Sequence, residues 1–344
     1  MPTLVGHWKN LAEAQKLTQS QLVPGVIEED VMRENIVERI PAALALGKTI
    51  KWLREAKVLD SDVAETEVGA ALSWSSSMEY TEVETELKMK YIQRPLDNFI
   101  PDVYGTVNDY EAQFLWELKK GVMRKMGKSL IYDDVTYGSS KQFDGLHALA
   151  ALQTGTDLDQ DNGEVGLSLH KVRVMLNAMK HGCDAIFVPF EIGMRWDEAY
   201  GENGLVSLAS GTAGGFSTIS RGVNEFGKPL YYYAGIPIIR TDYLAAEDDD
   251  TGVGSDARSL FTTGVKNYSI FGIKFGDLFA GNPGLCMGFG NPEMLSKLYN
   301  VTYFDKLEDR DGKGMRLMTY VAPLLGSKMC LGRIYDITDA AITA

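Results

Sequence analysis

The sequence predicts an α+β protein in which a projecting hairpin and a long helix accompany a compact insertion. Residues Thr81–Tyr91 alternate charged side chains with apolar or Thr side chains, which is the period of a β-strand with one solvated face. Between Val103 and Met126, apolar residues recur every three or four positions, the period of an amphipathic helix. From about residue 150 to 300, apolar runs alternate with helical stretches, as in a layered mixed domain.

The composition limits the classes of function. The chain has 344 residues, 45% of them hydrophobic, enough for one large or two ordinary domains. Its net charge of −13 argues against a protein that coats nucleic acid, because such proteins need clustered Lys and Arg. Three widely spaced cysteines predict reduced thiols. We expect a soluble intracellular product, since neither a signal peptide nor an apolar run of roughly 18 residues is evident.

The N-terminal residues predict an arm followed by a hairpin. Short helices are expected over Asn10–Gln21 and Glu28–Ile40. The strand at Thr81–Tyr91 is expected to pair with an amphipathic run at Thr49–Leu59, and the acidic stretch between them lacks a core. Because an isolated two-stranded hairpin is marginal in water, something else must cover it, and another chain is the natural candidate. The hairpin therefore indicates assembly rather than catalysis.

The long helix is expected to span roughly 35 Å at 1.5 Å per residue. Its last turns hold five cations without an acid among them, which suits the negative end of a helix dipole. These cations are Lys119, Lys120, Arg124, Lys125 and Lys128. Two further helices are expected over Ser168–His181 and Glu191–Tyr200. Strands are expected over Ala185–Phe190, Pro229–Tyr233, Ile236–Ile239, Tyr268–Phe275, Leu285–Phe289, Gly314–Leu325 and Lys328–Ile337.

No motif predicts a catalytic, cofactor or metal site. The run ending in Gly47–Lys48–Thr49 lacks the first glycine of a phosphate-binding loop and is expected to be an ordinary helix end. His181 and Cys183 lie two residues apart, but nothing supplies an orienting carboxylate. The acidic stretch at Asp157–Asp161 fails the calcium-loop pattern, and a second acidic stretch covers Asp248–Asp256. Both are expected to be solvated loops, with adventitious divalent binding as the alternative.

Two stretches carry a resemblance to a known family. They read Q-F-D-G-L at Gln142–Leu146 and G-K-P-L-Y-Y-Y-A-G-I-P-I-I-R-T-D-Y-L at Gly227–Leu244. Together with the arm, hairpin and long helix that precede them in order, they make the chain resemble the major capsid (major head) protein of tailed phages with the Hong Kong 97-type fold. The resemblance covers nearly the whole chain.

The resemblance implies a division into domains. It consists of an N-terminal arm (1–48), an extended hairpin loop (49–97), a peripheral domain with a spine helix (98–149 and 306–344) and an inserted axial domain (150–305). The spine helix would cover about Asp102–Lys128. Axial domains would surround five-fold and six-fold axes, and peripheral domains would meet at three-fold axes.

The resemblance also implies a structural role without enzymatic activity. The subunit would assemble as pentamers and hexamers into an icosahedral head that encloses double-stranded DNA without sequence-specific binding. Its partners would be a separate scaffolding protein, a portal and, optionally, a cement protein. It would have no membrane partner and no cofactor. The subunit would reside in the virion after assembly in the host cytoplasm.

Charge on the hairpin leads to a hypothesis for cohesion. Some family members link subunits covalently through a lysine on the extended loop, but residues 59–87 contain no Lys or Arg here, so we expect non-covalent cohesion. We hypothesise that the acidic hairpin of one subunit lies across the five helix cations of its neighbour. The alternative is two solvated charged patches. The acids are Asp60, Asp62, Glu65, Glu67, Glu79, Glu82, Glu84 and Glu86.

Two other functions remain open from the sequence. An encapsulin-like compartment shell has a similar fold but encloses protein cargo and usually has a shorter arm. A soluble α+β hydrolase would need the acidic stretches or the pair His181 and Cys183 to converge into a site.

Overall fold

The computed structural model describes residues 30–55, 63, 65–71, 80–97, 110–137, 140–201, 219–223, 229–251, 257–290, 299–308 and 312–343. The expected helix Asn10–Gln21 lies outside these residues. The strands are β1 (Ala42–Leu44), β2 (Thr49–Glu55), β3 (Tyr80–Glu86), β4 (Lys88–Asp97), β5 (Asp159–Val165), β6 (Ala185–Pro189), β7 (Ile219–Val223), β8 (Pro229–Tyr233), β9 (Ile236–Thr241), β10 (Glu247–Thr251), β11 (Arg258–Leu260), β12 (Asn267–Ile273), β13 (Leu285–Phe289), β14 (Asn300–Phe304), β15 (Gly312–Leu325) and β16 (Leu331–Thr338). The helices are α3 (Tyr110–Tyr132), α4 (Leu146–Ala151), α5 (Leu169–Ala178) and α6 (Phe190–Gly201), with single 3-10 turns η1 (Ile36–Glu38), η3 (Leu278–Ala280) and η5 (Lys328–Cys330).

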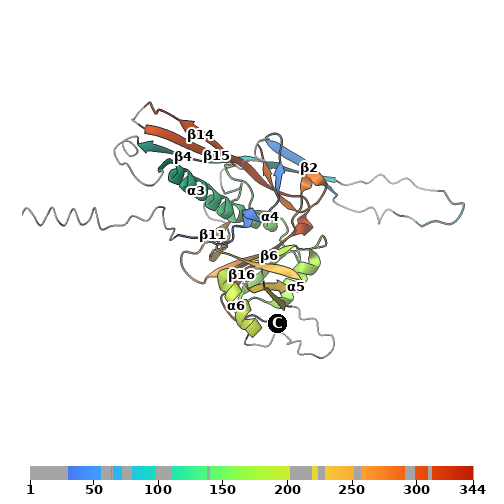
Figure 1. Cartoon of the computed structure of the whole chain (residues 1–344). Helices are drawn as coiled ribbons and strands as arrows, with labels where there is room; N and C mark the ends of the chain where they lie inside the picture. The colour runs from blue at the N-terminus through green and yellow to red at the C-terminus, as the bar shows by residue number, and fades with distance from the viewer. Residues whose placement is uncertain are drawn as a thin grey trace, which may run out of the picture.

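The strands form two main sheets and a separate hairpin. A five-stranded sheet has the order β1-β13-β15-β14, with β4 paired along β15. A nine-stranded sheet has the order β11-β10-β12-β6-β9-β8-β7, and β16 joins it between β12 and β5. Figure 1 shows the five-stranded sheet with α3 at one end of the molecule and the nine-stranded sheet with α5 and α6 at the other. The chain is thus an α+β protein, as the sequence predicts.

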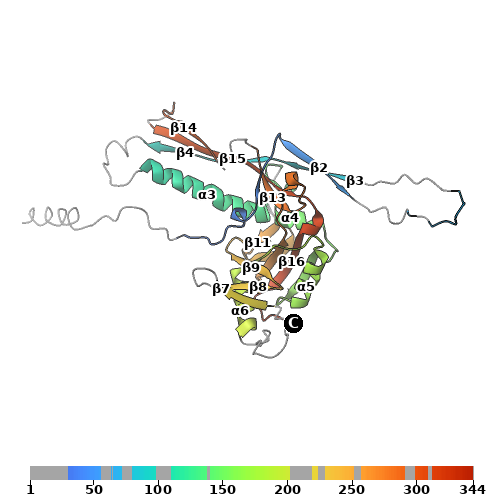
Figure 2. The same ribbon diagram turned by 45° about the vertical axis from the view of Figure 1, so that its right-hand side comes forward.

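Helix α3 packs along the five-stranded sheet (Figure 2). Its buried stripe consists of Leu118, Val122, Met126 and Leu130, spaced four residues apart on one helical face. The sequence pattern places three of these correctly. The helix continues to Tyr132, four residues beyond the predicted end, because its final turn is buried rather than solvated. Residues 102–109 of the predicted helix lie outside the described part of the chain.

The nine-stranded sheet contains most of the predicted strands. Strand β12 is buried along its whole length between β6 and β16, and both faces carry apolar side chains. Helix α5 packs on β5 and β16, and helix α6 packs on β6 and β9. Strand β16 connects the two parts of the molecule, since it follows β15 directly but pairs in the other sheet. The residues 306–344 that we grouped together therefore contribute to both sheets.

Residues 159–161 of the first acidic stretch and residues 248–251 of the second lie in strands rather than in solvated loops, and residues 252–256 lie outside the described part of the chain. Asp159–Val165 pairs in parallel with β16, and Glu247–Thr251 pairs with β11 and β12. The prediction was wrong because the buried carboxylates of Asp159 and Glu247 meet arginines that come from β11 and β16. A carboxylate can enter a core when such a partner compensates its charge.

The arm was predicted as a helix over Glu28–Ile40, and this is wrong for the described residues from 30 onward. Only one 3-10 turn forms, at Ile36–Glu38, and the side chain of Asn35 caps it by accepting from Val37 N at 3.1 Å. Tertiary hydrogen bonds hold the preceding backbone extended: Arg33 N donates to Asp242 Oδ2 at 2.8 Å, and the carbonyl of Glu34 accepts from Thr241 Oγ1 at 2.7 Å. These contacts override a weak helical preference.

The hairpin is confirmed. Strands β2 and β3 pair antiparallel from Thr49 opposite Glu86 to Glu55 opposite Tyr80, and they leave the body on the side away from the N-terminal half of α3 (Figures 1 and 2). After Leu87 the chain continues as β4, which pairs with β15 over ten residues. The segment Lys88–Asp97 therefore belongs to the five-stranded sheet and not to the projecting loop.

The two motifs behind the family resemblance have local structural reasons. In Q-F-D-G-L, Gly145 precedes α4 and lies against the end of α3, where a Cβ atom would approach the carbonyl oxygen of Leu130 to 2.7 Å. In Y-Y-Y-A-G-I-P, Ala234 and Gly235 have φ angles of 50° and 84° and form the tight turn between β8 and β9. Two successive positive φ angles are typical of the turn that matches hairpin twist.

Candidate functional site

The acidic face of the hairpin is partly neutralised within its own chain. Glu82 and Glu84 of β3 flank Lys51 of β2, whose Nζ lies 2.6 Å and 3.2 Å from their carboxylate oxygens. Glu86 lies 3.5 Å from Lys48 and 2.9 Å from Lys88. Cross-strand pairs of opposite charge stabilise a hairpin modestly. Three of the eight predicted interface acids therefore already have cationic partners.

The remaining acids divide between described and undescribed residues. Glu65 and Glu67 are exposed near the tip, where Ala70 N donates to the carbonyl of Glu67 at 3.1 Å in a turn that contains Gly69 with φ +93°. Val68 in the same turn is fully exposed. Asp60, Asp62 and Glu79 lie outside the described residues.

The opposite face of the hairpin anchors it to the body. Trp52 Nε1 donates to the carbonyl of Gly326 at 3.3 Å, and Arg54 Nε donates to the same oxygen at 2.7 Å. A second guanidinium nitrogen of Arg54 donates to the carbonyl of Leu325. Ile50 is buried beside the five-stranded sheet. These contacts fix the base of the hairpin to the end of β15, and they therefore set the direction in which the hairpin leaves the body.

The five predicted cations lie along the middle of α3 and not at its end. Lys119, Lys125 and Lys128 are exposed. Lys120 and Arg124 contact the arm, because Lys120 Nζ donates to the carbonyl of Asp30 at 3.1 Å and Arg124 pairs with the carboxylate of the same residue. The last turn of α3 contains no basic residue. None of the five cations therefore lies at the negative end of the helix dipole, where the sequence pattern predicts them.

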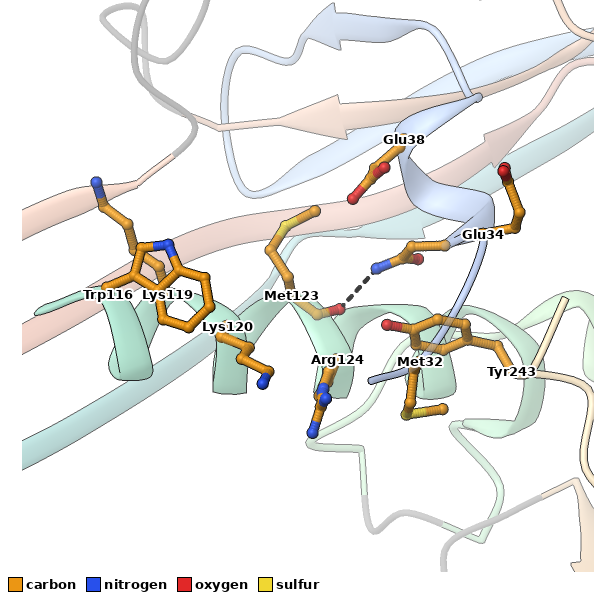
Figure 3. Close-up of a pocket in the computed structure, with 10 residues that line it drawn as sticks. Met32, Glu34, Glu38, Trp116, Lys119, Lys120, Met123, Arg124 and Tyr243 are labelled. Carbon is orange, nitrogen blue, oxygen red and sulfur yellow. Dashed lines mark hydrogen bonds between the residues drawn. The ribbon is translucent and has the colours of Figure 1, made fainter. Parts of the chain in front are cut away.

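A groove of about 380 Å³ opens between the arm and α3 (Figure 3). Its walls combine apolar side chains with three of the cations, and Asn35 of the arm joins the two walls by donating to the carbonyl of Met123 at 3.1 Å. The close approach depends on Gly127, where a Cβ atom would lie 2.5 Å from the ring of Tyr243. The groove is lined by Met32, Glu34, Asn35, Glu38, Trp116, Lys119, Lys120, Met123, Arg124 and Tyr243.

A buried ionic network that the sequence gives no signal for joins α4 to the nine-stranded sheet. Glu247 of β10 is fully buried and lies 2.9 Å from Arg258 Nε and 3.0 Å from His147 Nε2. It also accepts from Ser269 Oγ at 2.8 Å. Arg258 in turn pairs with Asp336 of β16. Strands β10, β11, β12 and β16 and helix α4 are thus joined by one buried network in which each carboxylate has a cationic or hydrogen-bonding partner.

The second half of the network fixes the tautomer of His147. Arg333 binds Asp159 through two hydrogen bonds of 2.6 Å and 2.9 Å, and its Nη1 lies 3.1 Å from His147 Nδ1. A guanidinium can only donate, so Nδ1 accepts and Nε2 carries the proton that points to Glu247. The ring stacks on Tyr132, with centroids 5.2 Å apart, and meets Phe271 edge-on.

The network predicts loss of stability in mild acid. Burial lowers the pKa of His147 from 6.5, and Arg333 and Arg258 act in the same direction against Glu247. The unfolded chain therefore takes up a proton before the folded protein does, so stability decreases as the pH falls below about 6.5, by at most about 1.4 kcal/mol per pH unit. Denaturant unfolding of the subunit at several pH values between 7 and 5 measures this slope. His147→Gln should flatten it, and an unchanged slope in that variant would contradict the assignment.

Glu247 also makes the stability of the subunit depend on pH, but in a lower pH range than His147 does. Burial by itself raises its pKa, but His147, Arg258 and Ser269 outweigh burial and lower the pKa below 4.5. The stability contributed by a carboxylate with a lowered pKa is present above its unfolded value and is lost as the pH falls through the folded value. Its effect therefore begins below the window assigned to His147.

The residues considered for enzymatic chemistry do not form a site in the described part of the chain. Cys183 donates to the carbonyl of Ala185 at 3.3 Å, and burial raises the pKa of its thiol to about 11, so it stays protonated beside an exposed His181. Gly47 and Lys48 do not end a helix but lie in the connection between β1 and β2, and Thr49 is the first residue of β2. Among the described residues, no group of three or more His, Cys, Asp or Glu is arranged to hold a metal ion. No described helix is long and apolar enough to span a membrane.

Several solved shell subunits are similar to this chain in structure. No protein-family model matches the sequence, and no curated protein matches it. The encapsulin of the holo-SrpI complex from Synechococcus elongatus PCC 7942 is 10% identical, with 97% of each chain covered and a TM-score of 0.66. The capsid of cyanophage P-SCSP1u is 10% identical, with 93% of each chain covered and a TM-score of 0.58. The capsid of an empty GTA particle is 12% identical, covers 95% of this chain and 98% of its own, and has a TM-score of 0.58. The chain therefore has the Hong Kong 97-type fold of phage capsids and encapsulin shells.

Proposed function

We propose that this chain is the major capsid protein of a tailed phage, which self-assembles as pentamers and hexamers into an icosahedral head around double-stranded DNA. The observation that carries the proposal is the shell-subunit fold over nearly the whole chain, combined with a hairpin that projects from the body. In this proposal the nine-stranded sheet with α5 and α6 forms most of the axial domain, and the five-stranded sheet with α3 forms most of the peripheral domain. Strands β13 and β14, which fall within residues 150–305, then belong to the peripheral domain. The mature location is the virion.

An encapsulin-like compartment shell is the second candidate, and the TM-score of 0.66 to an encapsulin favours it specifically. The two candidates differ in their partners. A capsid needs a portal, a packaging terminase and, for this chain, a separate scaffolding protein, with a cement protein as an optional addition. An encapsulin needs a cargo protein. The neighbouring genes distinguish the two, since terminase and portal genes support the capsid and a cargo gene supports the compartment.

Cohesion without a covalent link is part of the proposal. The first lysines that follow the hairpin tip in the sequence are Lys88 and Lys90, whose side chains are only 11% and 13% exposed. Lys88 is bound to Glu86 and to the carbonyl of Ser140, and Lys90 is bound to Asp133 and Ser129. Both side chains are therefore held inside their own subunit, which supports arm and hairpin contacts as the source of cohesion.

Charge reversal on α3 tests the contact between the acidic hairpin and the helix cations. Lys119→Glu combined with Lys128→Glu should reduce shell yield while leaving subunit stability within about 0.5 kcal/mol, because both side chains are exposed. Arg124 and Lys125 are less suitable, since Arg124 binds Asp30 and Lys125 lies 4.0 Å from Asp133. Shell yield is measured by sedimentation and stability by denaturant unfolding.

The matched control carries the same change in net charge elsewhere. Lys141 and Lys180 are also exposed, and both lie outside α3. Lys141→Glu with Lys180→Glu should assemble normally. Equal loss of shells in both double variants would assign the effect to net charge and remove the hairpin contact from the proposal.

A further inference from the structure

Three sulfur atoms lie together over a pair of glycines in the nine-stranded sheet. Gly272 of β12 and Gly332 of β16 stand directly opposite each other in the strand register. Around the place that a Cβ atom of Gly272 would take, Met179 Sδ lies at 3.1 Å and Cys183 Sγ at 3.4 Å. Around the corresponding place at Gly332, Met175 Sδ lies at 3.0 Å and Met179 Sδ at 3.3 Å. The two glycines therefore leave a space that the three sulfurs share.

Helix α5 and the turn that follows it bring these sulfurs together. Met175 and Met179 are four positions apart on one helical face, with Met179 N donating to the carbonyl of Met175 at 3.1 Å, and α5 packs on β16 (Figure 2). Gly182, with φ 87°, closes the turn by donating from its N to the carbonyl of Met179 at 2.8 Å. Both methionines are buried, whereas Cys183 is half-buried and follows the exposed His181. Solvent therefore reaches the cluster from the side of this turn.

The ligand types select a soft monovalent ion. Thioether and thiol sulfur suit Cu(I), whereas Mg²⁺ and Ca²⁺ need oxygen ligands and Zn²⁺ is bound by thiolates, imidazoles or carboxylates. Of the three side chains, only the thiol can become an anion. One Cu(I) with one thiolate carries no net charge and is tolerated in a core, whereas a divalent ion would leave a buried positive charge. The neighbouring Asp184 does not alter this balance, because its carboxylate lies 2.6 Å from Lys274 Nζ.

We propose that Met175, Met179 and Cys183 form a binding site for one Cu(I) ion. Binding is an exchange without a change of oxidation state: the thiol of Cys183, which donates to the carbonyl of Ala185 at 3.3 Å, gives its proton to solvent, and its sulfur bonds to the ion. Methionine has three rotatable side-chain bonds, so both thioethers can turn toward the ion while α5 stays in place. All three ligands come from one chain, and the site is therefore independent of the proposed shell function.

Titration of the purified full-length chain with Cu(I) tests the proposal, under anaerobic conditions with ascorbate as the reductant and bicinchoninate as the competing chelator. The unmodified chain should withdraw one Cu(I) per chain from the chelator. Met179→Leu keeps a side chain of similar volume and should weaken binding at least about tenfold, because losing a ligand costs no less than changing a residue that supports one. Cys183→Ser should remove the stoichiometric binding.

Two control variants make the same kinds of change outside the cluster. Met194→Leu replaces an exposed methionine of α6, and Cys286→Ala replaces a buried thiol of β13. Both should bind one Cu(I) with unchanged affinity. No stoichiometric binding by the unmodified chain, full affinity in Cys183→Ser or Met179→Leu, or equal loss in the controls would overturn the site.

A second variant decides the matter if Cys183→Ser does not fold. Met175→Leu combined with Met179→Leu removes two ligands and keeps apolar side chains of similar volume in the core. Weakened binding by this folded variant supports the site, and binding equal to that of the unmodified chain would overturn it. Thermal unfolding of each variant confirms that it is folded before the titration.

Discussion

Arg258→Met should lower the free energy of unfolding by about 3–5 kcal/mol, because the change leaves Glu247 and Asp336 buried without their shared cation. Glu247 has no exposed surface and cannot regain water without opening the sheet. His147 does not replace the lost charge, since burial and Arg333 hold it neutral. Denaturant unfolding of the unassembled subunit measures the difference. The shape of the side chain is largely kept, so the loss reports on charge.

The matched control is Arg240→Met. Arg240 also binds a carboxylate through two hydrogen bonds, of 2.8 Å and 2.6 Å to Asp197, but both side chains are partly exposed. An exposed pair contributes about 0–1 kcal/mol, so this variant should unfold almost as the unmodified chain does. Similar small losses in the two variants would show that the buried network is not a source of stability.

Gly145→Ala should lower the free energy of unfolding by about 3 kcal/mol, the upper end of the range for overpacking. Its Cβ atom would lie 2.7–2.9 Å from the carbonyl oxygens of Ser129, Leu130 and Ile131, which are backbone atoms at the end of α3 and cannot rotate aside. Gly145 N also donates to the carbonyl of Asp133 at 2.7 Å, which fixes the distance between the two segments. Thermal unfolding of the subunit detects the change.

Gly121→Ala, in the middle of α3, is the matched control and should stabilise the subunit instead of destabilising it. A Cβ atom there would meet only Ile92 Cδ1 at an ordinary distance of 3.9 Å. Alanine favours a helix over glycine by about 1 kcal/mol, so this variant should be stabilised. If Gly145→Ala were equally well tolerated, the close packing of the Q-F-D-G-L turn on α3 would not constrain the fold.

The elements that the sequence predicts correctly are those with a strong local period. The hairpin, α3, α5, α6 and most apolar strands follow from alternation or from a helical repeat that a single segment displays. Strands β5 and β10 were missed because Asp159 and Glu247 look like surface residues until their partners are known. Arg333 is separated from Asp159 by 174 positions, and no local pattern reports such a pair.

The candidate interface, too, could be predicted only in part from the sequence. The sequence identifies an acidic hairpin and a basic helix, but it does not show that Lys51 already neutralises Glu82 and Glu84, or that Arg124 holds Asp30 of the arm. These pairs arise from strand register and from the path of the arm. They reduce the charge that remains for a neighbour, and they direct attention to Lys119, Lys128 and the hairpin tip.

The most direct test of the central claim is electron microscopy of the purified full-length chain in negative stain, with light scattering on the same sample. A shell subunit should give closed shells or capsomer-sized rings, alone or when co-expressed with its neighbouring genes. A monodisperse monomer or dimer under both conditions, at every protein concentration, would contradict the assignment of this chain to a self-assembling shell.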